Sequence, residues 1–555
     1  MSETADGFFG DLGRERAIVL GGLMLGMLLG SIDQSIVSTA LPHIVGELGD
    51  PSKLSWIVTA YLVTVTATTP LYGKLSDLYG RSIVYEFAIA VFLIGSALSG
   101  VAGDIPVVNA YVGGMTQLAV FRALQGIGAG GLIAMATTIL GDIFSPRERG
   151  KYMSYMMVIF GVATIGGPIL GGWLTDNYTW RYIFYINIPI GLAAIAVIHT
   201  QLDLPVPNTS HTIDYLGSAL LVVAVSALTL LTTWGGTRYA WGSTAILALG
   251  AVTLVSAALF FLQEIRVEEP VFPVHLVEHR TFVGVIVLSL CLGAGMFGAT
   301  IYLPVFLQTV IGVSATNSGL LLLPLVGGLI VTSALTGQLM TRFGRYKEFT
   351  VLGGFVGSIG FWLLHTMGPE TTNLFTLTAL DWSFTLNAST AYMFVTGLGL
   401  GFIMPTLTIA VQNIVDRADL GAATTSVTFS RSLGSAVGTA VLGALLTSQL
   451  SSRLSDLGGA SGGGAGGMSS GGSIDPSVIN NLPPQIHDTV VTAIANSIDT
   501  VFLAGTGLLV VAFLVALALP GDSLDDEINV QMGEGGAEPM DEPAPSGEGE
   551  TTVND

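Results

Sequence analysis

Two charged side chains inside apolar stretches suggest that this chain performs proton chemistry. Asp33 is the only fully charged residue between Ala17 and Leu41, a stretch long enough to span a bilayer. Arg122 lies in a second apolar stretch, and Gln125 follows it on the same helical face. An ionisable group at membrane depth is costly and is by default a functional candidate.

The expected depths of Asp33 and Arg122 match. Each lies roughly 12–14 Å from the outer end of its predicted helix at 1.5 Å per residue, and the two helices run in opposite directions. Burial favours a protonated carboxyl group, whereas a nearby guanidinium favours the ionised form. If the two side chains meet, protonation of Asp33 can switch with conformation. The alternative is a structural Asp33 held by one Arg or by backbone donors.

The segment Gly73–Arg81 joins two predicted helices and is a candidate conformational latch. Gly73 and Gly80 permit a tight turn and a close approach of helices. Asp77 can accept hydrogen bonds from a neighbouring helix N-terminus, and Arg81 can pair with an acid across the bundle. The alternative is an ordinary loop with a basic flank.

Glycine and proline cluster in the predicted helix 152–175, at Gly167, Pro168, Gly171 and Gly172. Pro168 removes a backbone hydrogen bond, and the glycines let a neighbouring helix approach closely. We expect this helix to bend and pack tightly. A generic small-residue interface is the alternative.

Arg431 is a second basic residue inside a predicted span, and it shares a helix face with Gly434 and Gly438. Either it faces a central cavity or its long side chain reaches the nearer headgroups. The sequence leaves both positions open.

The elements that position these residues are membrane helices. The 555-residue chain is 51% hydrophobic and 10% charged, whereas a soluble protein has about 25% charged residues. We predict an all-α polytopic membrane protein with about fourteen spanning helices. Their predicted cores are 17–41, 55–75, 83–102, 113–141, 152–175, 183–201, 214–234, 244–264, 282–308, 316–340, 349–366, 390–414, 424–450 and 497–519.

Basic residues predict how these helices are oriented. With an even number of spans, most Lys and Arg residues fall in loops on one side. The other side holds only Lys53, Arg181, Arg238 and Arg453. Because basic residues accumulate in cytoplasmic loops, we expect both termini in the cytoplasm.

An internal repeat divides the chain. Gly73–Arg81 resembles Gly337–Arg345, and Asp142–Gly150 aligns with Asn413–Gly421. Repeats of this kind mark transporters whose halves move about a central site. The predicted units are a six-helix bundle (1–203), two inserted helices (204–270), a second six-helix bundle (271–520) with a Gly/Ser-rich outer loop (451–490), and an acidic tail (521–555).

Acidic residues dominate the formal net charge of −20, and many of them lie in the tail 521–555. That tail has almost no apolar residues, so we predict that it is disordered. An acid excess with so few lysines is halophile-like, because hydrated carboxylates keep protein surfaces soluble at high salt.

The sequence lacks the signatures of enzyme chemistry. It shows no metal-ligand spacing, P-loop or nucleophile elbow, and its 7 His residues lie near predicted helix ends or loops. The single Cys, Cys291, excludes a disulfide framework. We therefore predict no enzymatic activity, metal, cofactor or nucleic-acid partner.

The motifs resemble those of the major facilitator superfamily, and within it the fourteen-helix drug:proton antiporters. The helix-4 segment resembles a motif linked to proton transfer, and the helix-5 segment resembles the antiporter signature. Thr341 replaces the acid of the second latch segment, which puts a second latch in doubt. The matching segments are Ile32–Pro42, Gly73–Arg81, Arg122–Gly131, Gly167–Gly172 and Trp180–Pro189.

The resemblance implies a proton-driven exporter of lipophilic compounds that alternates access between two halves. Asp33 would exchange a proton and compete with substrate, and Arg122 would tune it. The predicted helix 316–340 contains no acidic residue, and the resemblance therefore implies neutral or monovalent substrates. The cavity candidates, for which packing or lipid-facing positions are the alternative, are Gln125, Arg431, Phe297, Tyr302, Phe306 and Met404.

Two other functions stay open at this point. One is transport of a single defined metabolite, and the other is a transporter-like membrane sensor that moves nothing and signals through its acidic tail. The expected partners are a lipophilic small molecule, protons and the lipid bilayer. The expected state is a monomer in the cytoplasmic membrane.

Overall fold

The structure is a computed structural model, and thirteen of its described helices are long and apolar enough to cross a membrane. A further helix, α3 (Leu54–Tyr79), is less apolar because several threonines interrupt it, yet it packs in the centre between α6 and α17. The structure describes residues 14–521 except 51–52, 106–110, 203, 205–213, 237, 268–269, 273, 314–318, 320, 369–372, 380–381, 417–418 and 458–483.

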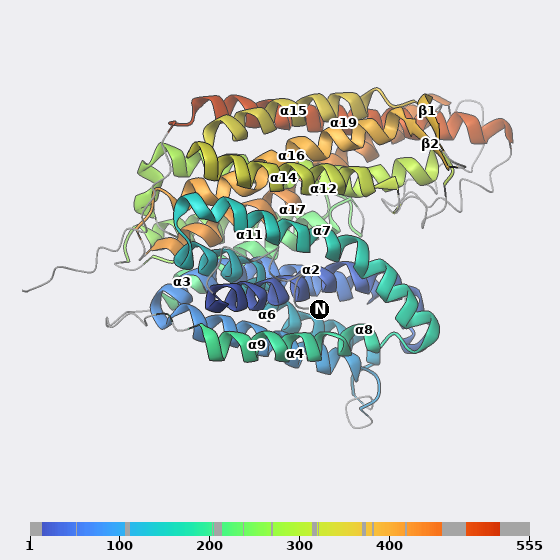
Figure 1. Cartoon of the computed structure of the whole chain (residues 1–555). Helices are drawn as coiled ribbons and strands as arrows, with labels where there is room; N and C mark the ends of the chain where they lie inside the picture. The colour runs from blue at the N-terminus through green and yellow to red at the C-terminus, as the bar shows by residue number, and fades with distance from the viewer. Residues whose placement is uncertain are drawn as a thin grey trace, which may run out of the picture.

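Two six-helix bundles make up most of the fold (Figure 1). The first bundle contains α2 (Arg14–Leu48), α3, α4 (Arg81–Gly100), α6 (Gly114–Ile143), α7 (Pro146–Asn177) and a helix divided into α8 (Tyr182–Tyr185) and α9 (Asn187–Gln201). The second bundle contains α12 (Arg280–Thr309), α14 (Leu323–Phe343), α15 (Lys347–His365), α16 (Ala388–Gln412), α17 (Leu420–Leu457) and α19 (Pro484–Ala518). The helix α7 lies against α14, and α3 lies against α17, so these pairs join the bundles.

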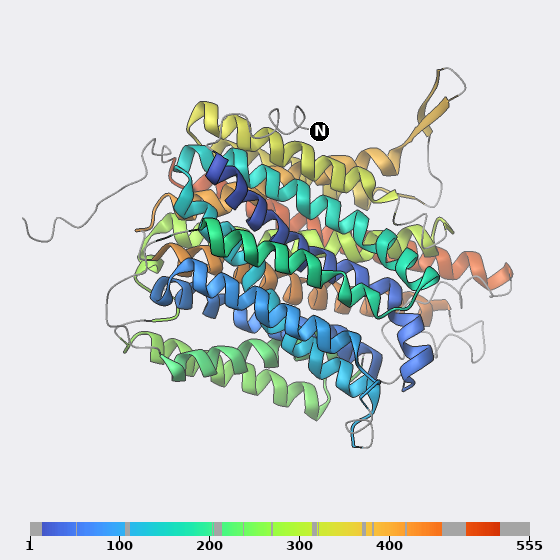
Figure 2. The same cartoon turned by 60° about the horizontal axis from the view of Figure 1, so that its bottom comes forward.

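The two inserted helices, α10 (Tyr215–Trp234) and α11 (Thr244–Glu264), pair with each other at the edge of the molecule (Figure 2). The helix α10 packs against both α3 and α17, and Trp234 meets Trp56 of α3 edge to face at 5.1 Å between ring centroids. Most of α11 is apolar and exposed, including Leu254 at 74%, as expected for a helix that faces lipid.

Consecutive helices alternate in direction, so their ends gather at two ends of the molecule. We call the end that contains the α3–α4 and α6–α7 junctions the basic end, because Lys74, Arg81, Arg149 and Lys151 lie there. The other is the opposite end.

Small residues explain how closely these helices pack. Lipid supplies no hydrophobic driving force between helices, so close van der Waals packing has to hold them together. A Cβ on Gly128 of α6 would lie 2.5 Å from the carbonyl oxygen of Ala88 in α4. A Cβ on Gly438 of α17 would lie 2.6 Å from Ala294 Cα in α12. A larger residue at either position would force the helices apart.

The all-α membrane fold predicted from the sequence is confirmed, with one local exception: the segment between α15 and α16 contains an antiparallel hairpin. Strand β1 (Asn373–Ala379) pairs with β2 (Trp382–Asn387). Both strands are rich in Thr, Phe and Leu, residues that include β-formers, but they are too short for a clear periodic signal.

Two other boundaries differ from the prediction. The helix α17 continues to Leu457 and α19 begins at Pro484, so the outer loop predicted at 451–490 is helical at both ends. Its central part, 458–483, lies outside the described residues, as does the tail 522–555. The segment predicted as a loop at 73–81 is helical up to Tyr79, and the turn consists of Gly80, which has a φ of +93°.

Candidate functional site

Asp33 and Arg122 form an ion pair inside the first bundle. Arg122 Nη1 donates to Asp33 Oδ2 at 2.6 Å, and the two side chains are 0% (Asp33) and 3% (Arg122) exposed. Gln125 bridges the pair, because its Oε1 accepts from Arg122 Nη1 and its Nε2 donates to Asp33 Oδ1, each at 2.8 Å. The matching depths in the sequence therefore correspond to a contact between α2 and α6.

Asn187 and Ser96 complete this buried network, and neither was a candidate from the sequence. Asn187 Nδ2 donates to Ser96 Oγ at 3.0 Å and lies 3.4 Å from Asp33 Oδ1. The break between α8 and α9 makes Asn187 the first residue of α9, facing the centre of the bundle. The one sequence signal that pointed to Asn187 was its place in the segment Trp180–Pro189, which resembles a family motif.

The network contains polar atoms that have no hydrogen-bond partner. Arg122 Nε and Asn187 Oδ1 are buried and unpaired within the described part of the chain. Buried polar atoms usually find partners, so these two give the network room to rearrange its hydrogen bonds when the charge on Asp33 changes.

A cavity of about 600 Å³ lies between the two bundles, a size that suits a small organic molecule. Its wall is mostly apolar, and it also carries many hydroxyl groups. Residues that represent the three parts of the fold are Gln34, Thr66 and Thr69 from the first bundle, Thr229 and Thr232 from α10, and Ser435 from the second bundle.

Four of the six predicted cavity residues line this cavity, namely Phe297, Tyr302, Met404 and Arg431. Arg431 is on the cavity wall, which is the first of the two positions that the sequence left open. Two predictions were wrong. Gln125 is held in the Asp33 network, and Phe306 is 0% exposed within the core of the second bundle.

Asp33 itself is not on the cavity wall, whereas its neighbour Gln34 is. Direct competition between substrate and Asp33 is therefore not built into this conformation. Thr229 and Thr232 of α10 and Trp241 of the loop between α10 and α11 also line the cavity. No sequence pattern indicated that this inserted pair reaches it.

The glycine cluster of α7 packs against α2 directly after Asp33. A Cβ on Gly167 would overlap Ser35 Oγ, and one on Gly171 would lie 2.8 Å from Ile36 Cγ1. Ser35 Oγ also donates to the carbonyl oxygen of Ala163 at 3.0 Å. Gly172 is different because no atom lies within 4 Å of its added Cβ. Pro168 lies inside the helix between the two contact glycines.

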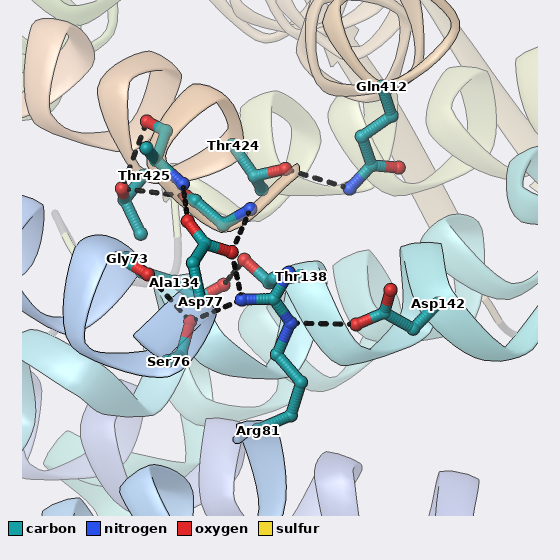
Figure 3. Close-up of polar contacts among 12 residues, drawn as sticks. Gly73, Ser76, Asp77, Arg81, Ala134, Thr138, Asp142, Gln412, Thr424 and Thr425 are labelled. Atoms are coloured by element: carbon teal, nitrogen blue, oxygen red, sulfur yellow. Dashed lines mark hydrogen bonds and ion pairs between the residues drawn. The ribbon is translucent and has the colours of Figure 1, made fainter. Parts of the chain in front are cut away.

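At the basic end, Asp77 joins the two bundles (Figure 3). Its carboxylate accepts from the backbone N–H groups of Gly421 at 3.1 Å and Ala422 at 2.9 Å, in the first turn of α17. These N–H groups have no partner within the helix, and the positive end of the helix dipole favours a carboxylate there.

Arg81 holds Asp77 in place. Its guanidinium pairs with Asp77, donates to Ser76 Oγ at 2.6 Å, and donates through Nε to Asp142 Oδ2 at 2.8 Å (Figure 3). The two contacts that the sequence suggested for Asp77 and Arg81 are both present. We call Asp77, Arg81, Asp142 and the first turn of α17 the latch.

Other contacts at the basic end also join the bundles. Arg149 Nη1 donates to the carbonyl oxygen of Gln412 at 3.1 Å, and Gln412 Nε2 donates to the carbonyl oxygen of Thr137 at 3.1 Å. Together with the bonds of Asp77, these contacts hold the two bundles against each other at the basic end. The basic end is therefore the closed end of the cavity in this conformation.

At the opposite end, Arg181 joins elements of the first bundle to one another. It pairs with Glu47, in the last turn of α2, and with Asp104 at 2.8 Å. Burial acts to raise the pKa of Glu47, but hydrogen bonds from Arg181 and Trp180 outweigh it, so the pKa of Glu47 lies below its usual range. This cluster links the end of α2 to the segment after α4 within the first bundle.

Two six-helix bundles around a cavity, with a latch between them, define a membrane transporter and not an enzyme. The sequence matches the family described as "Major Facilitator Superfamily" over residues 23–214 and 212–439. This chain belongs to the major facilitator superfamily.

Two relatives with similar sequences are named as multidrug transport or resistance proteins. The chain is 37% identical to the multidrug transporter protein MdtP of Bacillus subtilis over 420 residues, which cover 76% of this chain and 73% of the relative. It is 34% identical to multidrug resistance protein 3 of the same species over 416 residues, 75% of this chain and 77% of the relative. The solved proton:xylose symporter XylE aligns with a TM-score of 0.57 and 14% identity, over 91% of this chain and 97% of that chain, and shows the fold alone.

Proposed function

We propose that the protein is a proton-coupled antiporter that exports lipophilic compounds across the cytoplasmic membrane, with both termini in the cytoplasm. The observation that carries this proposal is the fully buried Asp33–Arg122 ion pair, which lies one residue from Gln34 on the cavity wall. The names of the multidrug relatives support drugs or toxic compounds as substrates. The excess of basic loop residues at one end supports the orientation.

In the proposed cycle, protonation of Asp33 removes the charge that neutralises Arg122. Arg122 then has to rely on Gln125 Oε1, its other acceptor in the network. An arginine stays charged at this depth, so the loss of its partner destabilises the present arrangement of α2 and α6. Proton binding is in this way converted into a preference for another conformation.

The packing of α2 offers a route from Asp33 to the second bundle. Gly167 and Gly171 of α7 lie on Ser35 and Ile36, so a shift of α2 moves α7. At the basic end α7 crosses α14, where Gly150 touches Gly337. We infer that a change at Asp33 loosens the contacts between the bundles at the basic end and opens the cavity there.

The test uses purified protein in proteoliposomes that contain a pH indicator. An imposed proton gradient should drive uptake of a lipophilic dye into the vesicles. Addition of the dye should in turn dissipate the proton gradient. Asp33→Asn should abolish both the dye flux and the proton flux, because an amide side chain does not bind and release protons near neutral pH. Asp176→Asn, at an exposed acid of α7, is the matched control and should behave like wild type.

A protonophore should stop dye movement in the wild type. Normal gradient-driven transport by Asp33→Asn, at equal protein content, would show that Asp33 is structural. Transport that is indifferent to the proton gradient would overturn proton coupling altogether.

A further inference from the structure

Arg431 is the one charged residue among the described residues that line the cavity. The wall contains many hydroxyl and apolar groups, but none of its described residues is an Asp, Glu, Lys or His. Asp33 is fully buried, does not line the cavity and is already paired with Arg122. The electrostatic character of the cavity is therefore set by a single guanidinium.

Arg431 also differs from the other arginines inside the protein. Arg122 is paired with Asp33, Arg81 with Asp77 and Asp142, and Arg149 donates to three carbonyl oxygens. Within the described part of the chain, the side chain of Arg431 has no hydrogen-bond or ion-pair partner. A guanidinium stays ionised in proteins, so Arg431 places an unpaired positive charge at the cavity wall at membrane depth.

We propose that this cavity binds organic anions: amphipathic molecules with a carboxylate, sulfonate or phosphate that pairs with Arg431. The planar guanidinium offers two parallel N–H donors, which match the oxygens of such a group. The proposal rests on the proposed export function for its biological meaning, and it narrows the substrate class from lipophilic compounds in general.

The surroundings of Arg431 suit an anionic head and an apolar body. Thr428 and Ser435 lie three residues before and four residues after Arg431 on α17, so all three share one helix face and line the cavity. Their hydroxyl groups can donate to further anion oxygens. Met296, Phe297 and Met404 provide an apolar wall of adaptable side chains.

A lipophilic cation would meet the opposite conditions. It would share a low-dielectric cavity with an unpaired guanidinium, and none of the described wall residues could neutralise it. The affinity of a neutral compound would not depend on the charge of Arg431. The expected order of affinity is therefore anion, then neutral compound, then cation.

Three probes with one fluorophore test this order. Dansylglycine is anionic, dansylglycinamide is neutral and dansylcadaverine is cationic at pH 7. Energy transfer from tryptophan to dansyl gives the apparent Kd of each probe for the full-length protein in phosphatidylcholine vesicles, with protein-free vesicles as the blank. Trp241 lines the cavity, so a bound probe is close to a donor.

We expect dansylglycine to bind at least tenfold more tightly than dansylcadaverine. Arg431→Gln should weaken dansylglycine at least tenfold and change dansylglycinamide less than threefold. Arg431→Lys, which keeps the charge without the bidentate geometry, should retain a preference for the anion. A second set of vesicles contains the anionic lipid phosphatidylglycerol. If such a lipid is the natural occupant, it should compete with dansylglycine for the cavity, while the protein should still bind anions in preference to cations.

Three results would overturn the proposal: equal or tighter binding of the cation, an equal loss for all three probes in Arg431→Gln, or binding of none of them to the wild type. These measurements need no proton gradient, so they separate the anion site from proton coupling. Gradient-driven export of dansylcadaverine alone would leave proton coupling intact and refute the anion site.

Discussion

The two bundles cross at the basic end in two related places, where α3 meets α17 and where α14 meets α7. Both crossings bring a glycine of one bundle onto a glycine of the other. A Cβ on Gly73 would lie 2.7 Å from the carbonyl oxygen of Gly421, and one on Gly150 would lie 2.8 Å from that of Gly337. The internal repeat thus gives both crossings the same close backbone approach.

The crossings differ in how the helix that starts there is capped. The first turn of α17 is capped from the other bundle by Asp77. The helix α7 is capped by its own chain, through a capping box in which Ser145 accepts from the backbone N–H of Glu148. Thr341, in the position of the missing acid, donates to the carbonyl oxygen of Gly337 within its own helix.

This difference shows what an acid at one position adds to a shared scaffold. Where a helix start depends on a carboxylate of the other bundle, separating the bundles leaves that helix without its cap. Where the cap is internal, separation leaves the helix start intact. The first crossing is therefore suited to stabilise the conformation in which the basic end is closed. The second is suited to act as a pivot, a contact about which the bundles turn without losing a cap.

The largest effect should come from adding a side chain at either crossing. Gly73→Ala and Gly337→Ala should each reduce the rate of transport in proteoliposomes at least tenfold, because the new methyl group would overlap backbone of the other bundle. Gly327→Ala, on α14 but with no atom within 4 Å of the added Cβ, is the control and should keep most of its activity. Should Gly73→Ala alone be harmful, the two crossings would not share the same tight fit.

A smaller effect on the transport rate should distinguish the crossing that has an acid, at Asp77, from the crossing that lacks one, at Thr341. Asp77→Asn should slow transport about tenfold, a scale typical of coupling energies, whereas Thr341→Val should stay within about twofold. Ser432 lines the cavity, so Ser432→Cys in a Cys291→Ala background places a single reporter thiol there. In that protein, Asp77→Asn should also make the thiol react faster with an alkylating reagent added at the basic end. Equal effects of the Asp77 and Thr341 substitutions would remove the distinction between latch and pivot.

The smallest effect concerns the internal cap of α7. Ser145→Ala should lower the free energy of unfolding by about 1 kcal/mol, the usual value of an N-cap, and leave transport nearly unchanged. Ser145→Asp preserves a capping oxygen and should restore stability in the same denaturation assay. A large loss of transport in Ser145→Ala with normal stability would mean that the start of α7 also changes during the cycle.

The fold and the Asp33–Arg122 pair were predictable because both depend on patterns along one chain. Apolar length predicts the spans, and distance along a helix predicts depth, so two opposed charges at one depth can be matched without a structure. The contacts of Asp77 were predictable in kind only. Its partners are backbone N–H groups, which carry no residue identity that a sequence could reveal.

The cavity wall could be predicted less well. Phe306 and Tyr302 are separated by one helical turn, yet Tyr302 lines the cavity while Phe306 is in the core. Such a difference depends on how far each helix is rotated, which the sequence pattern does not specify. The contribution of Thr229 and Trp241 was missed for a related reason, since the side on which an inserted helix pair docks is a property of the assembled fold.

The docking of α10 has a consequence for the surrounding bilayer. Because α10 touches α3 in one bundle and α17 in the other, any rotation that separates these two helices detaches α10 from at least one of them. Acyl chains then have to cover the released surface, and their length and stiffness enter the free energy of that step. The lipid composition of the membrane should accordingly help to set how fast this transporter turns over.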